Sequence, residues 1–207
     1  MLSEVSNQTG LPQSLFELEQ LQELHINTFS TEEDFGEDCT LLSILPKGFK
    51  KLRQLKALNL AENELVQLHP ELATLEQLEQ LDLTENELEA EAIRDLPPNL
   101  TRLDLSYNQL KELPDSLQEL KQLRHLDVSY NQITQIPDWL STLPIEVLYL
   151  NANQLQEAQK VLFNIKTLRK LELKNCQITS LSIPEEPKSQ LQELTLGTTP
   201  LTQLPAC

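Results

Sequence analysis

The chain of 207 residues is long enough for one sizeable domain, and its 32 acidic and 16 basic residues give it a formal net charge of −16. Nucleic-acid backbones and anionic membrane surfaces attract clusters of Lys and Arg, so this charge argues against both as the main partner. No segment approaches the roughly 20 apolar residues of a transmembrane helix, and residues 1–10 have neither the basic nor the apolar region of a signal peptide.

Residues 1–20 contain Leu11-Pro12-x-x-Leu15-x-x-Leu18. We interpret this segment as the second half of a repeat unit that serves as an N-terminal cap. The unit itself is clearest in residues 100–122, which read Leu-x-x-Leu-x-Leu-x-x-Asn-x-Leu and then Leu-Pro-x-x-Leu-x-x-Leu. About eight units begin with Leu or Ile, at Leu21, Leu55, Leu78, Leu100, Leu123, Ile145, Leu168 and Leu191.

The spacing of the units is regular, because after a first interval of 34 residues every interval is 22 or 23 residues. A fixed period of this length predicts a solenoid, in which each unit buries its leucines against its neighbours. Alternate residues of a short strand point to one face, which predicts one inward pair in each unit. These pairs are Leu58 and Leu60, Leu81 and Leu83, Leu103 and Leu105, Leu126 and Val128, Leu148 and Leu150, Leu171 and Leu173, and Leu194 and Leu196.

An Asn recurs after the predicted strands, at Asn63, Asn86, Asn108, Asn131 and Asn153. The chain must turn there, and a buried amide can both donate to and accept from the backbone groups that the turn leaves over. Cys176 and Thr199 take this place in the last two units as weaker partners.

With these motifs, the chain resembles leucine-rich repeat proteins of the subtype with 22–23 residues per repeat. The resemblance implies an α/β solenoid over residues 1–207, a curved right-handed superhelix with a concave parallel sheet and short helical or 3₁₀ segments on its convex side. It also implies a non-catalytic module that binds a protein through its concave face. Such a module is expected in the bacterial cytoplasm, or in a host cell as a delivered effector. The alternative is the sensor or scaffold domain of a larger signalling protein, such as a kinase or GTPase.

Several units depart from the pattern. The unit at Leu21 carries an acidic insertion at 28–39, either a solvated loop or a partner-binding loop with Phe29 and Phe35 as anchors. Helix-forming residues predict a short helix over 89–95 and a longer one over 156–166, the latter with Val161, Leu162 and Ile165 inward. Trp139 is expected to pack on the convex side. The chain stops partway through a unit, which leaves an end for another chain or domain to cover or for the last coil to cap.

The sequence contains no motif for catalysis, a metal or a cofactor. Its three histidines are far apart, it has no Gly-rich phosphate loop, and the acids of the insertion lack calcium-loop spacing. Three widely spaced cysteines form neither a disulfide framework nor a zinc site, which favours a reducing compartment. We therefore expect no enzyme activity and no cofactor.

The candidate binding residues occupy the predicted concave face or follow its strands. Asp82, Asp104 and Asp127 form a column of acids whose mutual repulsion a basic partner would relieve, unless the acids simply bond to neighbours or Arg102 and His125 balance them. Tyr107, Tyr130 and Tyr149 lie in three successive units, and tyrosine is enriched in binding hot spots, although tyrosines are also exposed by chance. The complete set is Asp82, Arg102, Asp104, Tyr107, His125, Asp127, Tyr130, Tyr149, Lys170 and Glu172.

Overall fold

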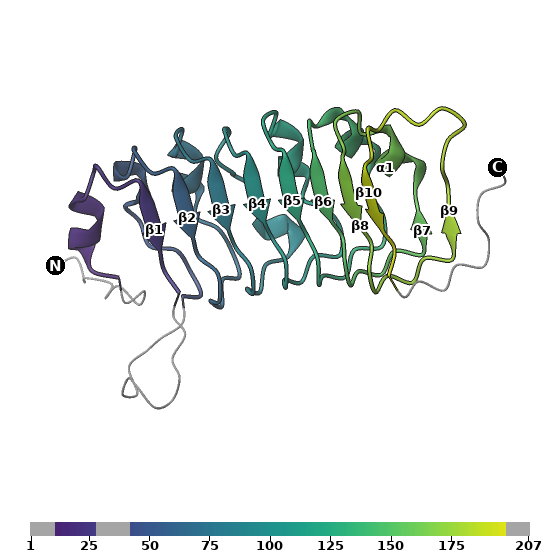
Figure 1. Cartoon of the computed structure of the whole chain (residues 1–207). Helices are drawn as coiled ribbons and strands as arrows, with labels where there is room; N and C mark the ends of the chain where they lie inside the picture. Colours follow the sequence, from purple (N-terminus) through teal and green to yellow (C-terminus); the bar gives the residue numbers. More distant parts are fainter. Residues whose placement is uncertain (1–10, 28–41, 198–207) are drawn as a thin grey trace.

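A computed structural model describes residues 11–27 and 42–197, and its coils stack side by side as a curved solenoid (Figure 1). One parallel sheet of eight short strands runs along the concave face in the order β1-β2-β3-β4-β5-β6-β8-β10. Each coil contributes its strand at the same position, so equivalent residues of neighbouring coils lie side by side on adjacent strands. The strands are β1 Glu23–His25, β2 Ala57–Asn59, β3 Gln80–Asp82, β4 Arg102–Asp104, β5 His125–Asp127, β6 Val147–Tyr149, β8 Lys170–Glu172 and β10 Glu193–Thr195.

Short helical segments form the convex side, and Figure 1 shows them on the far side of the sheet. Most of them begin after an extended residue, such as Pro12 before η1, His69 before η3 and Pro137 before η6, whereas η2 begins after Gly48 with a φ of 127°. A second sheet pairs β7 (Glu157–Ala158) with β9 (Ser180–Leu181). The helical segments are η1 Gln13–Glu17, η2 Phe49–Lys51, η3 Pro70–Thr74, η4 Ala90–Ala92, η5 Asp115–Glu119, η6 Asp138–Thr142 and α1 Lys160–Asn164.

Both predicted helices are shorter than the sequence suggests. The 89–95 segment forms only the 3₁₀ turn η4, since Glu89 is extended and Ile93 already turns into the core with 1% exposure. The 156–166 segment starts as β7, because Glu157 and Ala158 pair with the next coil, and α1 begins only at Lys160. Tertiary pairing thus overrides the helix propensity of these residues. The inward positions of this segment were predicted correctly, because Val161, Leu162 and Ile165 are buried.

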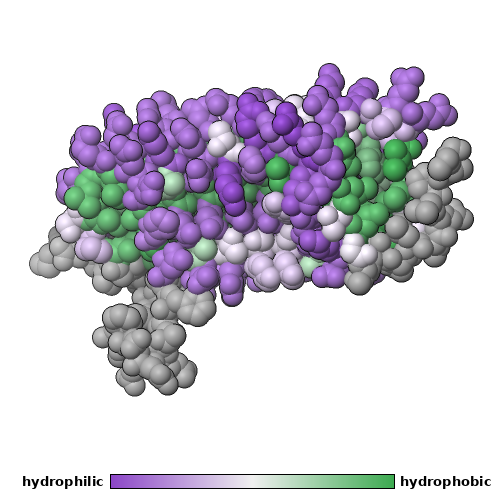
Figure 2. Space-filling model, in the orientation of Figure 1, coloured by the Kyte–Doolittle hydropathy of each residue, from purple (hydrophilic) through white to green (hydrophobic). Residues whose placement is uncertain are grey.

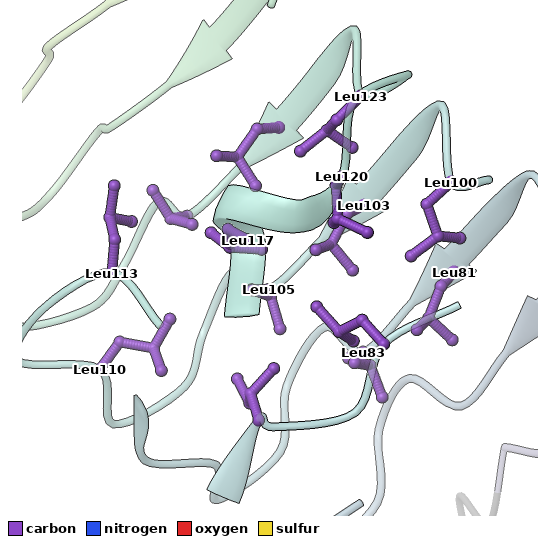
Figure 3. Packing of buried hydrophobic residues seen from close by; sticks show 14 of the residues in the cluster. Leu81, Leu83, Leu100, Leu103, Leu105, Leu110, Leu113, Leu117, Leu120 and Leu123 are labelled. Atoms are coloured by element: carbon purple, nitrogen blue, oxygen red, sulfur yellow. The ribbon is translucent and has the colours of Figure 1, made fainter. Parts of the chain in front are cut away.

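The core is one continuous column of buried leucines. In the central coils Leu103 and Leu105, from the strand side, lie beside Leu117 and Leu120, from the convex side (Figure 3). The inward pairs of the units that begin at Leu55 through Leu168 are all buried, as predicted. The last pair is an exception: Leu194 is 37% exposed and Leu196 is partly buried, since β10 is the last strand of the sheet. Trp139 packs against the core from η6, also as predicted.

The recurring Asn side chains form the predicted ladder. In Asn108, Nδ2 donates to the carbonyl oxygen of Leu83 in the preceding coil at 2.9 Å, and Oδ1 accepts from the N–H of Leu88 at 3.0 Å. The equivalent amides repeat these contacts, and Cys176 retains one of them by donating its thiol to the carbonyl of Leu150 at 3.2 Å. Burial raises the pKa of this thiol. Thr199, the 28–39 insertion and residues 1–10 of the predicted cap lie outside the described residues.

The N-terminal coils are joined by a contact that the repeat pattern does not contain. The rings of Phe16 and Phe49 meet edge to face with centroids 5.4 Å apart. Next to them, Gly48 has a φ of 127° and donates its N–H to Oε2 of Glu71 at 2.7 Å. Lys50 pairs with the other oxygen of Glu71 at 3.5 Å. One carboxylate thus ties η2 to η3.

Candidate protein-binding site on the concave face

The sheet register places eight of the ten candidate residues in two rows on the concave face. One row continues from Arg102 through His125 and Val147 to Lys170. The second row contains Asp82, Asp104, Asp127, Tyr149 and Glu172. Tyr107 and Tyr130 follow β4 and β5 in the chain and lie beyond the C-terminal ends of these strands. The candidate set is therefore continuous over β3 to β8.

Each acid of the column closes a turn of its own chain. In Asp104, Oδ1 accepts from the backbone N–H of Ser106 at 3.0 Å and from its hydroxyl at 2.6 Å. Asp127 accepts from the N–H of Ser129 at 2.8 Å, and Asp82 accepts from Thr84 in the same way. One oxygen of each carboxylate therefore bonds to a neighbouring residue, which was the alternative to a role in partner binding.

The second oxygens differ along the column. In Asp82, Oδ2 accepts from the side-chain amide of Asn59 at 3.1 Å. In Asp104 and Asp127, by contrast, Oδ2 accepts no hydrogen bond from the described residues. Asp104 and Asp127 are half-buried partners on adjacent strands, and such strands lie roughly 4.8 Å apart. Burial raises the pKa of Asp127 above its ordinary value, and the charge of Asp104 raises it further. The contacts with Ser129 and the charge of Arg102 lower it, but the net direction is upward.

Two of the three tyrosines form a pair. The rings of Tyr107 and Tyr130 are stacked, with centroids 4.1 Å apart and an angle of 8° between their planes. Their exposed fractions are 48% and 44%, so the stack faces solvent. The Tyr130 hydroxyl beside it raises the pKa of Tyr107. Figure 2 shows hydrophilic side chains over the central coils and a paler band of intermediate hydropathy where β4 and β5 end.

Tyr149 belongs to a different group of side chains. It lies within β6, and Nζ of Lys170 stands 5.4 Å from its ring centroid. Lys170 also pairs with Glu172 at 3.1 Å and Glu193 at 3.0 Å, and Glu172 pairs with Lys174 at 3.0 Å. Burial raises the pKa of Glu172, but Lys174 and Lys170 outweigh it and the net shift is downward. The C-terminal end of the candidate set is therefore a self-neutralised network, distinct from the open acids.

The structure adds residues that the candidate set omits. A hollow of about 140 Å³ on the concave face is lined by His25, Asn59, Gln80, Asp82, Arg102 and Asp104, among others. Glu85 precedes Asn86 as Tyr107 precedes Asn108, so the two occupy the same place in adjacent coils. That common offset from the ladder Asn is the sequence signal by which Glu85 could have been included.

The described ranges hold no group of three His, Cys, Asp or Glu side chains that could bind a metal ion. Across the same ranges, no helix has the length and hydropathy that a membrane span requires.

The repeated strands, the Asn ladder and the leucine column can be compared with known proteins. A family model described as "Leucine rich repeat" matches residues 37–88, 86–133 and 98–155, which together span more than half of the chain. The chain belongs to the leucine-rich repeat family. Proteins of this family generally serve as protein-interaction modules, and their repeats are typically non-catalytic.

A solved structure agrees with this leucine-rich repeat fold. The chain is similar to an internalin (inlF) from Listeria monocytogenes, with a TM-score of 0.64 and 24% sequence identity. The match covers 89% of this chain but 56% of the internalin chain, so this chain corresponds to little more than half the length of that protein. At this identity the similarity concerns the fold alone. The curated proteins contain no significant match.

Proposed function

We propose that this leucine-rich repeat chain is a non-catalytic module that binds a protein with a basic surface through its concave face. The contact region is the acid–tyrosine patch, which we define as Asp82, Asp104, Asp127, Tyr107 and Tyr130. Arg102 and His125 border the patch in the neighbouring row of the sheet. The net charge of −16 disfavours nucleic acid and anionic membranes as partners and favours a cationic protein surface.

The observation that carries the proposal is a charge that the fold does not need. Asn59 occupies the same row as Asp104 and Asp127, and its Oδ1 accepts from the N–H of Ala61 at 2.9 Å. A neutral amide therefore closes the same turn. The carboxylates of Asp104 and Asp127 add a mutual repulsion, roughly 0.9 kcal/mol for two charges at the strand spacing of about 4.8 Å in water, and the charge of Arg102 offsets it only in part at Asp127. A cation from a partner would reach their open Oδ2 atoms and remove that repulsion.

The stacked tyrosines support a protein partner for the same region. A tyrosine supplies a large, rigid contact area with a polar tip, which is why it is enriched in binding hot spots. In Tyr107 and Tyr130 nearly half of each side chain faces solvent beside the open carboxylates. The patch thus combines an aromatic rim with an acidic centre.

The test is an affinity capture from cell lysates with three purified baits. The first is the wild type, and the second carries Asp104→Asn, Asp127→Asn, Tyr107→Asn and Tyr130→Asn. The third is a charge-matched control with Glu91→Gln and Glu119→Gln, which lie exposed in η4 and η5 on the convex side. Circular dichroism first establishes that the three baits fold alike.

We expect a partner that is retained by the wild type and by the convex control and is lost from the patch variant. Retention should fall with added salt, because exposed charge contacts are screened. A partner that binds the patch variant as well as the wild type would refute the concave-face proposal. A partner lost equally from both variants would show that net charge, rather than the patch, determines binding.

We further propose that the module works in a reducing compartment such as the cytoplasm. The support is the thiol of Cys176, which is 3% exposed and replaces an Asn in the ladder. Labelling of Cys176 with a thiol reagent in denatured protein taken directly from cells tests this. A thiol already blocked in such protein would contradict it.

A further inference from the structure

One column of side chains runs along the C-terminal ends of the strands. Each member comes one residue before the ladder position of its coil. Its members share a backbone in the left-handed region, with φ between 52° and 60°. Such values are uncommon for residues other than glycine, and here they recur because every coil makes the same turn. The column comprises Glu62, Glu85, Tyr107, Tyr130, Ala152 and Asn175.

The two tyrosines of this column present one open ring face each. Their rings are nearly parallel and come from adjacent coils, so the stack extends along the solenoid. The outer face of Tyr107 therefore points toward the coil of Glu85, and the outer face of Tyr130 points toward the coil of Ala152. Neighbouring strands are about 4.8 Å apart, which is close to the separation of two stacked planar groups.

The two outer faces differ in charge. The next member of the column beside Tyr107 is the exposed Glu85, and the next member beside Tyr130 is Ala152, whose side chain is a methyl group. The hydrogen bond with Tyr130 and burial are the main causes of the raised pKa of Tyr107, and the charges of Glu85 and Asp127 both add to it. A flat cation is thus favoured at the first face, where the column supplies a carboxylate, over the second, where the column supplies a methyl group.

We propose that the outer face of Tyr107, together with Glu85, is a subsite for an arginine side chain of the protein partner. This inference rests on the proposed function and specifies its chemistry. A guanidinium is planar, stacks on an aromatic face and donates through a rigid fork to a carboxylate. The ammonium of lysine is a compact, strongly hydrated charge that cannot stack, so the subsite prefers arginine.

The same molecule contains a comparable arrangement made from its own residues. Lys170 lies over the ring of Tyr149 with its Nζ 5.4 Å from the centroid, and it pairs with Glu172 and Glu193. A cation held by a tyrosine ring and a carboxylate thus already occurs on this sheet. At Tyr107 the ring and the carboxylate are present, and the partner supplies the cation.

The test uses two synthetic 12-residue peptides that are identical except that one carries four arginines and the other four lysines, spaced by Gly and Ser. The chain has only three tyrosines, so protein labelled with ¹³C in its tyrosine rings gives three sets of ring signals. Tyr107→Asn and Tyr130→Asn assign them, and both should fold because Asn175 adopts the same backbone in its own coil.

We expect the arginine peptide to bind about 2- to 5-fold tighter than the lysine peptide, as for a cation on an exposed ring. The Tyr107 signals should move most and those of Tyr149 least. Tyr107→Asn should remove the preference for arginine, and Glu85→Gln should weaken it. Ala152→Asn, placed beside the other ring face, should leave it unchanged.

Equal affinity for the two peptides, a preference that survives Tyr107→Asn, or the absence of any change in the tyrosine signals would overturn the arginine subsite. The proposed function fails by a different result. If both peptides bind equally and lose affinity with Asp104→Asn and Asp127→Asn, the acidic patch remains a binding site without an arginine subsite. If the patch variant still captures its partner from lysate, the concave-face function fails whatever the peptides show.

Discussion

The side-chain amide of Asn59 donates to Oδ2 of Asp82 at 3.1 Å, across two adjacent strands of the sheet. The same side chain closes its own turn through Oδ1 and the N–H of Ala61. Asn59 therefore makes the turn contact of Asp104 and Asp127 and also donates a hydrogen bond to the second oxygen of its neighbour Asp82. This comparison shows that the fold requires a side-chain oxygen at this row to close the turn, which an amide supplies as well as a carboxylate. The negative charge of Asp104 and Asp127 is additional to that requirement.

Asp127→Asn should leave the protein folded and raise its free energy of unfolding at pH 7 by up to about 1 kcal/mol. The amide avoids the burial of a charge, retains the contact with Ser129 and removes the repulsion with Asp104, and together these outweigh the lost attraction to Arg102. Because the native pKa of Asp127 is raised, the wild-type carboxylate destabilises the fold as pH rises through that pKa. The advantage of the variant should therefore fade below the ordinary pKa of Asp, about 3.9.

Urea denaturation at several pH values measures this effect, with Glu119→Gln as a variant of equal charge change on the convex side. A loss of more than about 1 kcal/mol in Asp127→Asn would show that the charge itself supports the fold, contrary to the argument from Asn59.

Glu71→Gln should destabilise the protein at pH 7 and have little effect near pH 3. Burial raises the pKa of Glu71, but the N–H groups of Gly48 and Lys50 outweigh it, so the net shift is downward. The stabilisation from a carboxylate with a lowered pKa is present above its ordinary pKa and disappears as pH falls through the native value. Stability curves from pH 3 to 7 for the wild type and Glu71→Gln should converge at the acidic end. Parallel curves would contradict the role of the charge.

Asn131→Ala should cost about 1–3 kcal/mol. Its Nδ2 donates to the carbonyl oxygen of Leu105 at 2.9 Å, and its Oδ1 accepts from the N–H of Leu110 at 2.9 Å. Alanine would leave the buried N–H of Leu110 without a partner, which costs about 1–3 kcal/mol, whereas the carbonyl of Leu105 keeps its contact with Nδ2 of Asn108 at 3.2 Å. Asn131→Cys should cost less, because Cys176 shows that a thiol retains one of the contacts. Equal losses in the two variants, measured by denaturant unfolding, would argue that the ladder acts through packing alone.

Gly48→Ala should destabilise the N-terminal coils by about 1–3 kcal/mol. Its φ of 127° is strained for alanine, and the added Cβ would stand 2.7 Å from ring atoms of Phe16. Hydrogen exchange should increase in η1 and η2 before it increases in the central coils. In a double-mutant cycle, Phe16→Leu should partly offset Gly48→Ala, and strict additivity would show that the ring contact is not the cause.

The period of the leucines and asparagines determined the solenoid, its coil boundaries and its buried pairs. The reason is that each unit buries the same positions against its neighbours and closes the same turn with the same side chain. Leu103, Leu105 and Asn108 have the same environment as their equivalents one period away. The sequence predicted the structure less well in coils whose strand pairing differs from that of the other coils. Glu157 and Ala158 became a strand because β9 lies beside them, and Leu194 stayed exposed because β10 is the last strand of the sheet.

The sequence also placed the candidate acids and tyrosines on neighbouring coils, since a parallel register follows from the repeat. Only the tertiary structure distinguished among them. The column of acids includes Asp82, whose second oxygen accepts a hydrogen bond from Asn59, and Asp104, whose second oxygen is open. Tyr107 stacks on Tyr130, whereas Tyr149 lies under Lys170. Spacing along the chain fixes the coil and face of a residue, but hydrogen bonds and ring contacts depend on which atoms the adjacent coil brings within reach.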